Sequence, residues 1–189
     1  MKIEDLKNPY IFLSSGFGLG LIPLAPGTMG SGFGLCLYIY MAHFHLPTFI
    51  IYLSLMVLLL VAWIAVSKTL KQLGEGDHPE IVIDEIIGMM FVATVLPADP
   101  YWAIAAFLLF RFFDIVKPFP INKVDRAYKN AFGIILVSFL TVVILQMLWY
   151  KFGNCMMFRE GESWDMEIPQ YISAWMWTII LGYKLFLRL

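Results

Sequence analysis

Charged side chains are scarce in this chain of 189 residues, of which Asp, Glu, Lys and Arg together make up 14%. The net charge is −1, so the chain lacks the basic surplus typical of proteins that bind nucleic acid. Its two cysteines, Cys36 and Cys155, lack the spacing of a zinc site and are too few for a disulfide framework. We therefore expect no nucleic-acid partner, zinc site or disulfide scaffold.

Hydrophobic residues take up 60% of the sequence, and the mean hydropathy is +0.77. Soluble proteins contain roughly half apolar residues, and a chain of this size has too much surface to bury so many more. The alternative is a soluble protein with an unusually apolar core. The composition favours an all-α integral membrane protein.

Long apolar runs predict a helical bundle of about four membrane crossings. At about 1.5 Å per residue, such runs span a hydrocarbon core of about 30 Å. Two shorter runs, 86–96 and 101–110, are separated by the turn signal P-A-D-P and predict a short central helical hairpin. We assign residues 1–150 to a helical membrane domain and 151–189 to a divergent C-terminal extension. The predicted crossings are 29–46, 47–66, 132–150 and 171–187.

The distribution of charge predicts how the bundle is oriented. Segment 111–131 carries five basic residues and two acidic ones, which is typical of a cytoplasmic segment. The hairpin brings 67–85 to the same side, and the preceding crossings bring 16–28 there too. Segment 151–170, with four acids and two bases, falls outside. Three polar segments are thus predicted to meet at the cytoplasmic face.

The first of these segments, S-S-G-F-G-L-G-L-I-P-L-A-P-G-T-M-G-S-G-F-G at 14–34, holds seven glycines. Glycines allow backbone amides to approach an anion, and a helix start favours phosphate. Gly27, Thr28 and Ser31 are therefore candidate phosphate ligands. The alternative is a helix whose small residues serve packing against a neighbour. A nucleotide P-loop is excluded because no lysine follows the last glycine.

The second segment, D-H-P-E-I-V-I-D-E at 77–85, places acids at the head of an apolar run. Asp84 and Glu85 are adjacent, and Asp77 lies two helical turns before Asp84. Carboxylates at a membrane edge are costly unless they are paired, solvated or bound to a cation. Clustered acids suit Mg²⁺, which prefers oxygen ligands and commonly shares them with a phosphate. The three residues are candidate metal ligands. A solvated helix start is the alternative.

The third segment, F-R-F-F-D-I-V-K-P-F-P at 110–120, places Arg111, Asp114 and Lys117 at i, i+3 and i+6. On a helix these side chains share one stripe, and Lys117-Pro118 predicts the helix end. Arg111 and Lys117 are candidate phosphate donors, and Asp114 is a candidate metal ligand or nucleophile. A simple i,i+3 ion pair is the alternative.

Taken together, G-F-G-L-G-L-I-P-L-A-P-G-T-M-G-S, D-H-P-E-I-V-I-D-E-I-I-G and F-R-F-F-D-I-V-K-P-F-P resemble the signatures of phosphatidylglycerophosphatase A. The resemblance implies a largely helical, Mg²⁺-dependent phosphatase at the cytoplasmic face of the bacterial inner membrane. It implies hydrolysis of phosphatidylglycerophosphate to phosphatidylglycerol, with membrane lipids as surroundings. Asp84, Glu85 and Asp114 would then be catalytic, and these three with Asp77 would bind Mg²⁺.

One departure from the family pattern concerns the stretch after Gly133. The family usually continues there with a paired aspartate motif, D-D-x-x-A-G. Here A-F-G-I-I-L runs into V-S-F-L-T-V-V-I-L-Q, and no aspartate occurs between Asp125 and Asp165. A second hypothesis is therefore a catalytically impaired relative that binds lipid phosphate or acts as a membrane scaffold.

Overall fold

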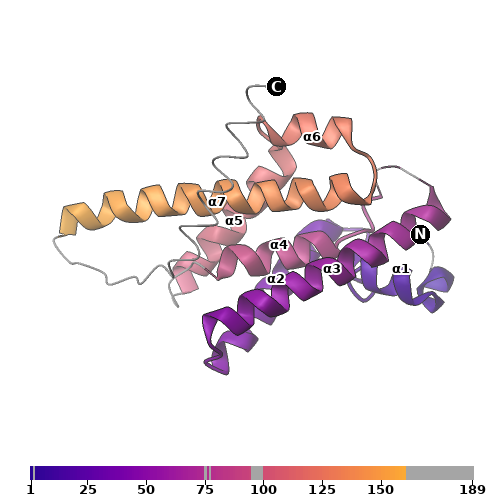
Figure 1. Cartoon of the computed structure of the whole chain (residues 1–189), viewed down its shortest axis with the longest axis horizontal. Helices are drawn as coiled ribbons and strands as arrows, with labels where there is room; N and C mark the ends of the chain where they lie inside the picture. The colour runs from indigo at the N-terminus through magenta and orange to yellow at the C-terminus, as the bar shows by residue number, and fades with distance from the viewer. Residues whose placement is uncertain (2, 75, 77, 95–99, 161–189) are drawn as a thin grey trace. The chain divides into compact units, whose positions relative to one another are not determined.

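The computed structural model describes residues 1–160 apart from 2, 75, 77 and 95–99 (Figure 1). Every regular element among these residues is a helix, which confirms the predicted all-α class. The chain divides into two compact units, Met1–Trp149 and Tyr150–Leu189, and the contacts below belong to the first. The elements are η1 (Ile3–Lys7), α1 (Pro9–Ser14), η2 (Leu19–Leu21), α2 (Pro26–His43), α3 (Thr48–Leu73), α4 (Ile83–Ala93), α5 (Pro100–Val116), α6 (Ile121–Ala127) and α7 (Ala131–Glu160).

Prolines and left-handed residues set the helix boundaries. Pro26 and Pro100 are the first residues of α2 and α5, where the missing N–H of proline has no intrahelical partner to lose. Helix α3 ends at Leu73, and the next residue, Gly74, has φ +95°. Helix α5 ends at Val116, because Lys117 has φ +45° and Pro118 follows. The predicted helix end at Lys117-Pro118 is confirmed.

Two described helices are long and apolar enough to cross a membrane. They are Phe49–Leu73 in α3 and Ala131–Leu148 in α7, with mean hydropathies of 2.8 and 2.5. Helix α3 exposes a broad apolar face that includes Phe49, Leu53 and Trp63. Such a face is stable against lipid and costly against water. These findings support the predicted crossings at 47–66 and 132–150.

The other two predicted crossings have a different outcome. The crossing predicted at 29–46 is a helix, α2, which is not among the described helices that are long and apolar enough to cross a membrane. The crossing predicted at 171–187 lies outside the described residues. The structure therefore supports two of the four predicted crossings directly.

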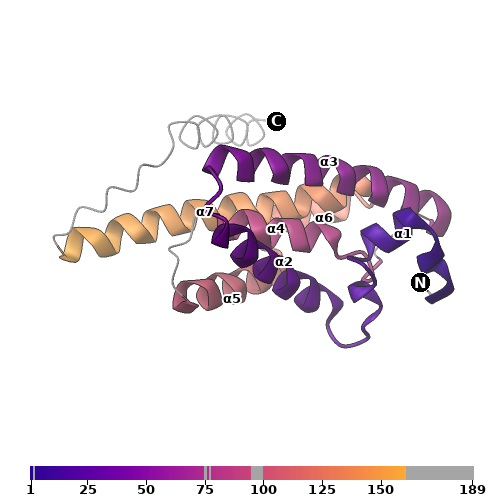
Figure 2. The ribbon, with the colours of Figure 1, turned by 90° about the horizontal axis from the view of Figure 1, so that it is seen from below.

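Helix α4 forms the centre of the bundle, and all of its residues except Glu85 are buried. Figures 1 and 2 show it beside α2, α3 and α5, and its most extensive packing is against α2. Gly30 and Gly34 of α2 face Val82 and Ile86, and a Cβ at Gly34 would collide with the backbone of Ile86. Small residues thus let the two helices approach closely. For this part of the glycine-rich segment, helix packing is the observed role.

Polar side chains cover the buried C-terminal end of α4. The last carbonyl groups of any helix lack intrahelical partners, and in an apolar interior they require others. Gln146 Nε2 of α7 donates to the Phe91 carbonyl at 3.1 Å, and Thr94 Oγ1 donates to it at 2.7 Å. Tyr52 of α3 bonds to the Thr94 hydroxyl at 3.0 Å. These contacts explain how an 11-residue helix can end inside the bundle.

Candidate active site

The first turn of α4 brings two carboxylates to the meeting point of four helices. Asp84 and Glu85 follow directly on Ile83, the first residue of α4, where free backbone amides favour negative charge. Since adjacent residues point about 100° apart on a helix, the two side chains meet different neighbours. Asp84 reaches Ser138 of α7, whereas Glu85 reaches Arg111 of α5 and Gly27 of α2.

Arg111 links the second and third polar segments. Its Nη1 donates to Glu85 Oε1 at 3.2 Å and to Asp114 Oδ2 at 2.8 Å. The same atom donates to the Ser31 hydroxyl at 3.4 Å, which brings in the first segment. The three charged side chains are only 14%, 16% and 12% exposed, respectively. The prediction that the three segments meet is confirmed for these four residues.

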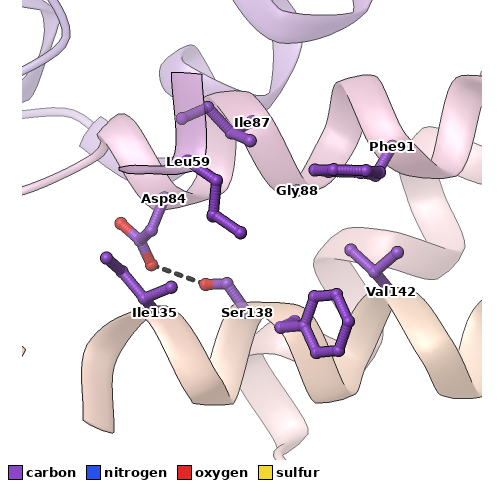
Figure 3. A pocket seen from close by; sticks show the side chains of 9 residues that line it. Leu59, Asp84, Ile87, Gly88, Phe91, Ile135, Ser138 and Val142 are labelled. Atoms are coloured by element: carbon purple, nitrogen blue, oxygen red, sulfur yellow. Dashed lines mark hydrogen bonds between the residues drawn. The ribbon is translucent and has the colours of Figure 1, made fainter. Parts of the chain in front are cut away.

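Asp84 lies deeper than Glu85, and its residue is 8% exposed. The Ser138 hydroxyl donates to Asp84 Oδ2 at 2.5 Å (Figure 3). Around this pair, a small pocket is lined by apolar groups of α3, α4 and α7. Figure 3 shows Leu59, Ile87 and Ile135 on its walls near the carboxylate. Asp84 therefore has one strong polar contact in surroundings of low dielectric.

Burial controls the electrostatics of the three carboxyl groups. It raises the pKa of Asp84 to about 6, against the Ser138 hydrogen bond, which lowers it. It also raises the pKa of Glu85 well above its ordinary value, and the negative charges of Asp84 and Asp114 raise it further. Burial likewise raises the pKa of Asp114, although Arg111 and Lys117 oppose this shift. A cation bound beside the cluster would stabilise its ionised form.

Three buried polar atoms of the cluster have no hydrogen-bond partner among the described residues. They are Asp84 Oδ1, Glu85 Oε2 and Arg111 Nε. Buried polar groups are nearly always satisfied, and each unsatisfied one costs about 1–3 kcal/mol. The two carboxylate oxygens can bind a cation, and the guanidinium N–H can bind an anion. The site is therefore chemically suited to a metal ion and a phosphate oxygen.

Other predicted site residues have varied positions. Ser31 donates to the Gly27 carbonyl at 2.8 Å and is buried, while Thr28 is half-buried in the first turn of α2. Lys117 lies beyond the end of α5 and donates to Asp125 Oδ1 at 2.8 Å. Lys117 is the first residue after α5 and has φ +45°, and its positive charge still lowers the pKa of Asp114. Asp77 lies outside the described residues.

Comparison with known proteins decides the family. The family model for phosphatidylglycerophosphatase A matches residues 12–149. The chain belongs to the phosphatidylglycerophosphatase A family. Members of this family are phosphoric monoester hydrolases. Together with the apolar helices α3 and α7, this membership makes the chain a membrane protein.

Three relatives cover most of the chain. A phosphatidylglycerophosphatase A of Haemophilus influenzae is 41% identical over 76% of this chain and 88% of its own length. One of Escherichia coli is 35% identical over 79% of this chain and 86% of its own. A protein named putative phosphatidylinositol-3-phosphatase, from Bacteroides thetaiotaomicron, is 33% identical over 70% and 86%, respectively. No solved structure matched the chain.

The structure adds Ser138 to the candidate site of this phosphatidylglycerophosphatase A family member. Ser138 lies in V-S-F-L-T, the stretch after Gly133 where sequence analysis finds the paired aspartates missing. A lone serine within an apolar run carries no sequence signal. Only the packing of α7 against α4 brings it to Asp84.

The described residues fit Mg²⁺ in one particular way. No group of three His, Cys, Asp or Glu side chains in the described part of the chain is placed to hold a metal ion. Two unpaired carboxylate oxygens, on Asp84 and Glu85, are nevertheless buried in the same cluster. Mg²⁺ is usually held by one or two carboxylates together with waters and substrate phosphate. The donor set therefore fits that type of site.

Gly27 provides the space in which the Glu85 carboxylate lies. A Cβ at position 27 would overlap this carboxylate. We expect Gly27→Ala to displace Glu85 and to lower kcat/KM for phosphate release by about 10²-fold, as a shift of about 1 Å can do. Gly32→Ala is the matched control, since a Cβ there meets only Phe107 at 3.9 Å. Thermal unfolding is measured for both variants. If Gly27→Ala and Gly32→Ala lose kcat/KM to the same degree, the effect belongs to α2 as a whole.

Proposed function

We propose that this protein is a Mg²⁺-dependent lipid phosphatase that hydrolyses phosphatidylglycerophosphate to phosphatidylglycerol and phosphate. The supporting observation is the cluster of unpaired buried atoms, in which two carboxylate oxygens and one guanidinium N–H share a site. The names of the two relatives with the highest identities above give the substrate. The basic segment 111–131 supports placement of the site at the cytoplasmic face of the bacterial inner membrane.

Each residue has a distinct role in this proposal. Asp84 and Glu85 would hold Mg²⁺ through their unpaired oxygens, and Asp114 would complete the acidic side of the site. Bound Mg²⁺ supplies charge neutralisation of the phosphoryl group. Arg111 binds a phosphate oxygen through its free Nε–H, which leaves Nη1 on Glu85 and Asp114. Gly27, Thr28 and Ser31 line the phosphate position at the start of α2. Lys117 is a further phosphate donor.

Hydrolysis requires a nucleophile and two proton movements. In the direct route, water attacks phosphorus, a carboxylate accepts its proton, and the bond from phosphorus to the glycerol oxygen breaks. The glycerol oxygen then takes up a proton. In the covalent route, the Asp114 carboxylate attacks phosphorus, the bond from phosphorus to the glycerol oxygen breaks, and that oxygen takes up a proton. Water then attacks the phosphorus of the acyl phosphate, which releases phosphate and regenerates the carboxylate. Both routes depend on the positioning and charge stabilisation that phosphoryl transfer demands.

Purified protein in detergent micelles tests the proposal with three lipids. We expect phosphate release from phosphatidylglycerophosphate in Mg²⁺, at higher kcat/KM than from phosphatidic acid or phosphatidylinositol 3-phosphate. The last lipid is included because the name of the Bacteroides relative indicates it. A preference for that lipid would reassign the substrate and keep the reaction class.

Removal of the metal is expected to stop turnover. Because the buried cluster holds excess negative charge, phosphate has no favourable position there without a divalent cation. Excess EDTA should lower phosphate release by at least about 10²-fold, and added Mg²⁺ should restore it, whereas Na⁺ at equal ionic strength should not. Activity that persists after dialysis against EDTA would contradict a metal-dependent mechanism.

A second candidate function rests on a specific observation. The described residues lack a three-carboxylate metal group, and the stretch after Gly133 lacks aspartates. A catalytically impaired protein would bind lipid phosphate through Arg111 and act as a scaffold. Saturable binding of phosphatidylglycerophosphate without phosphate release would establish that function and overturn the first.

A further inference from the structure

Ser138 uses its hydroxyl differently from Ser31 and Thr141, two other buried hydroxyl residues of the described helices. Serine and threonine inside a helix commonly donate back to a carbonyl three or four residues earlier. Thr141, one turn further along α7, does so to Val137 at 3.0 Å, and Ser31 does so to Gly27. Ser138 instead donates across to α4, to an oxygen of Asp84 that is 54 residues away in sequence.

This contact fixes one carboxylate oxygen and leaves the other available. Oδ2 of Asp84 accepts from Ser138 at 2.5 Å, whereas Oδ1 has no partner. Both residues are more than nine-tenths buried. Figure 3 shows apolar side chains around them, so water cannot easily replace the hydroxyl. In such surroundings a hydrogen bond is strong and holds one rotamer.

We propose that Ser138 is a positioning residue, which holds the Asp84 carboxylate so that Oδ1 faces the metal ion. This inference rests on the proposed function. Carboxylates that bind metals are usually oriented by a second hydrogen-bond partner, and loss of that partner costs about 10–100-fold in metal affinity. Because residues 134–148 of α7 have no carboxylate, the contribution of this part of α7 to the site is the Ser138 hydroxyl.

Direct metal binding tests the role without relying on turnover. Mn²⁺, which also prefers oxygen ligands, is titrated into the purified protein in detergent and its binding followed by electron paramagnetic resonance. We expect Ser138→Ala to raise the Kd for Mn²⁺ by about 10–100-fold. Ser138→Thr, which keeps the hydroxyl, should restore most of the affinity. Thr141→Val is the matched control, since its hydroxyl bonds only within α7, and its Kd should equal that of the wild type.

The outcomes separate this inference from the function on which it rests. Equal Mn²⁺ affinity in Ser138→Ala and the wild type would overturn the positioning role, as would an equal loss in Thr141→Val. Absence of Mn²⁺ binding in the wild type would overturn the metal site itself, and the inference with it. If thermal unfolding shows Ser138→Ala to be misfolded, Ser138→Cys replaces it, because cysteine has a similar size to serine and a weak S–H donor. Ser138→Cys should lose less Mn²⁺ affinity than is expected for Ser138→Ala.

Discussion

Asp84→Asn is expected to lower kcat for phosphate release by about 10²–10⁴-fold without loss of folded stability. Asparagine has nearly the size of aspartate, and its carbonyl oxygen can still accept from Ser138. The substitution removes a negative charge from a site where burial already disfavours it. Thermal unfolding should therefore occur at an equal or higher temperature than in the wild type. An active-site carboxylate, unlike a structural one, gives this combination of lost activity and retained stability.

The comparison for Asp84→Asn is Glu4→Gln, which removes an exposed carboxylate in η1. Both variants are assayed with phosphatidylglycerophosphate at saturating Mg²⁺. We expect Glu4→Gln to retain the activity of the wild type. Wild-type kcat in Asp84→Asn would remove Asp84 from the site.

Arg111→Ala is expected to lower both stability and activity. The variant leaves Glu85 and Asp114 buried without their counter-charge, which costs about 3–5 kcal/mol in folding free energy. It also removes the donor aimed at phosphate, and loss of an arginine in that role lowers the rate of phosphoryl transfer by about 10³–10⁵-fold. Arg111→Lys keeps the charge and loses the fork of donors, so it should recover stability more than activity.

A triple variant separates the two effects of Arg111. When Glu85→Gln and Asp114→Asn accompany Arg111→Ala, all three charges of the two salt bridges are removed, so neither carboxylate is left without its counter-charge. Its unfolding temperature should return toward that of the wild type, while activity stays lost. Arg126→Ala, on an exposed residue of α6, is the matched control and should change neither property. Full activity in Arg111→Ala would contradict the phosphate-binding role.

Local sequence signals predict much of the fold. The apolar runs give α3 and α7, and Lys117-Pro118 gives the end of α5. The meeting of Glu85 with Arg111 follows from a topology argument, since the outer ends of a hairpin lie on the same side. Periodicity and charge therefore predict which segments assemble.

The remaining features depend on contacts between distant segments. Lys117 bonds to Asp125 of α6, a partner that the i, i+3, i+6 spacing does not indicate. Gly30 and Gly34 serve packing against α4, which sequence alone could not separate from anion binding. Ser138 gains its role from a partner 54 residues away. A short-range pattern contains no information about such pairings.

The most direct test of the account is to locate the metal. Crystals grown with Mn²⁺ and a non-hydrolysable phosphonate analogue of the lipid would give an anomalous signal at the ion. We expect a single peak bonded to oxygens of Asp84 and Glu85, with the phosphonate against Arg111. A peak bound by other residues, or a phosphonate remote from Arg111, would contradict it.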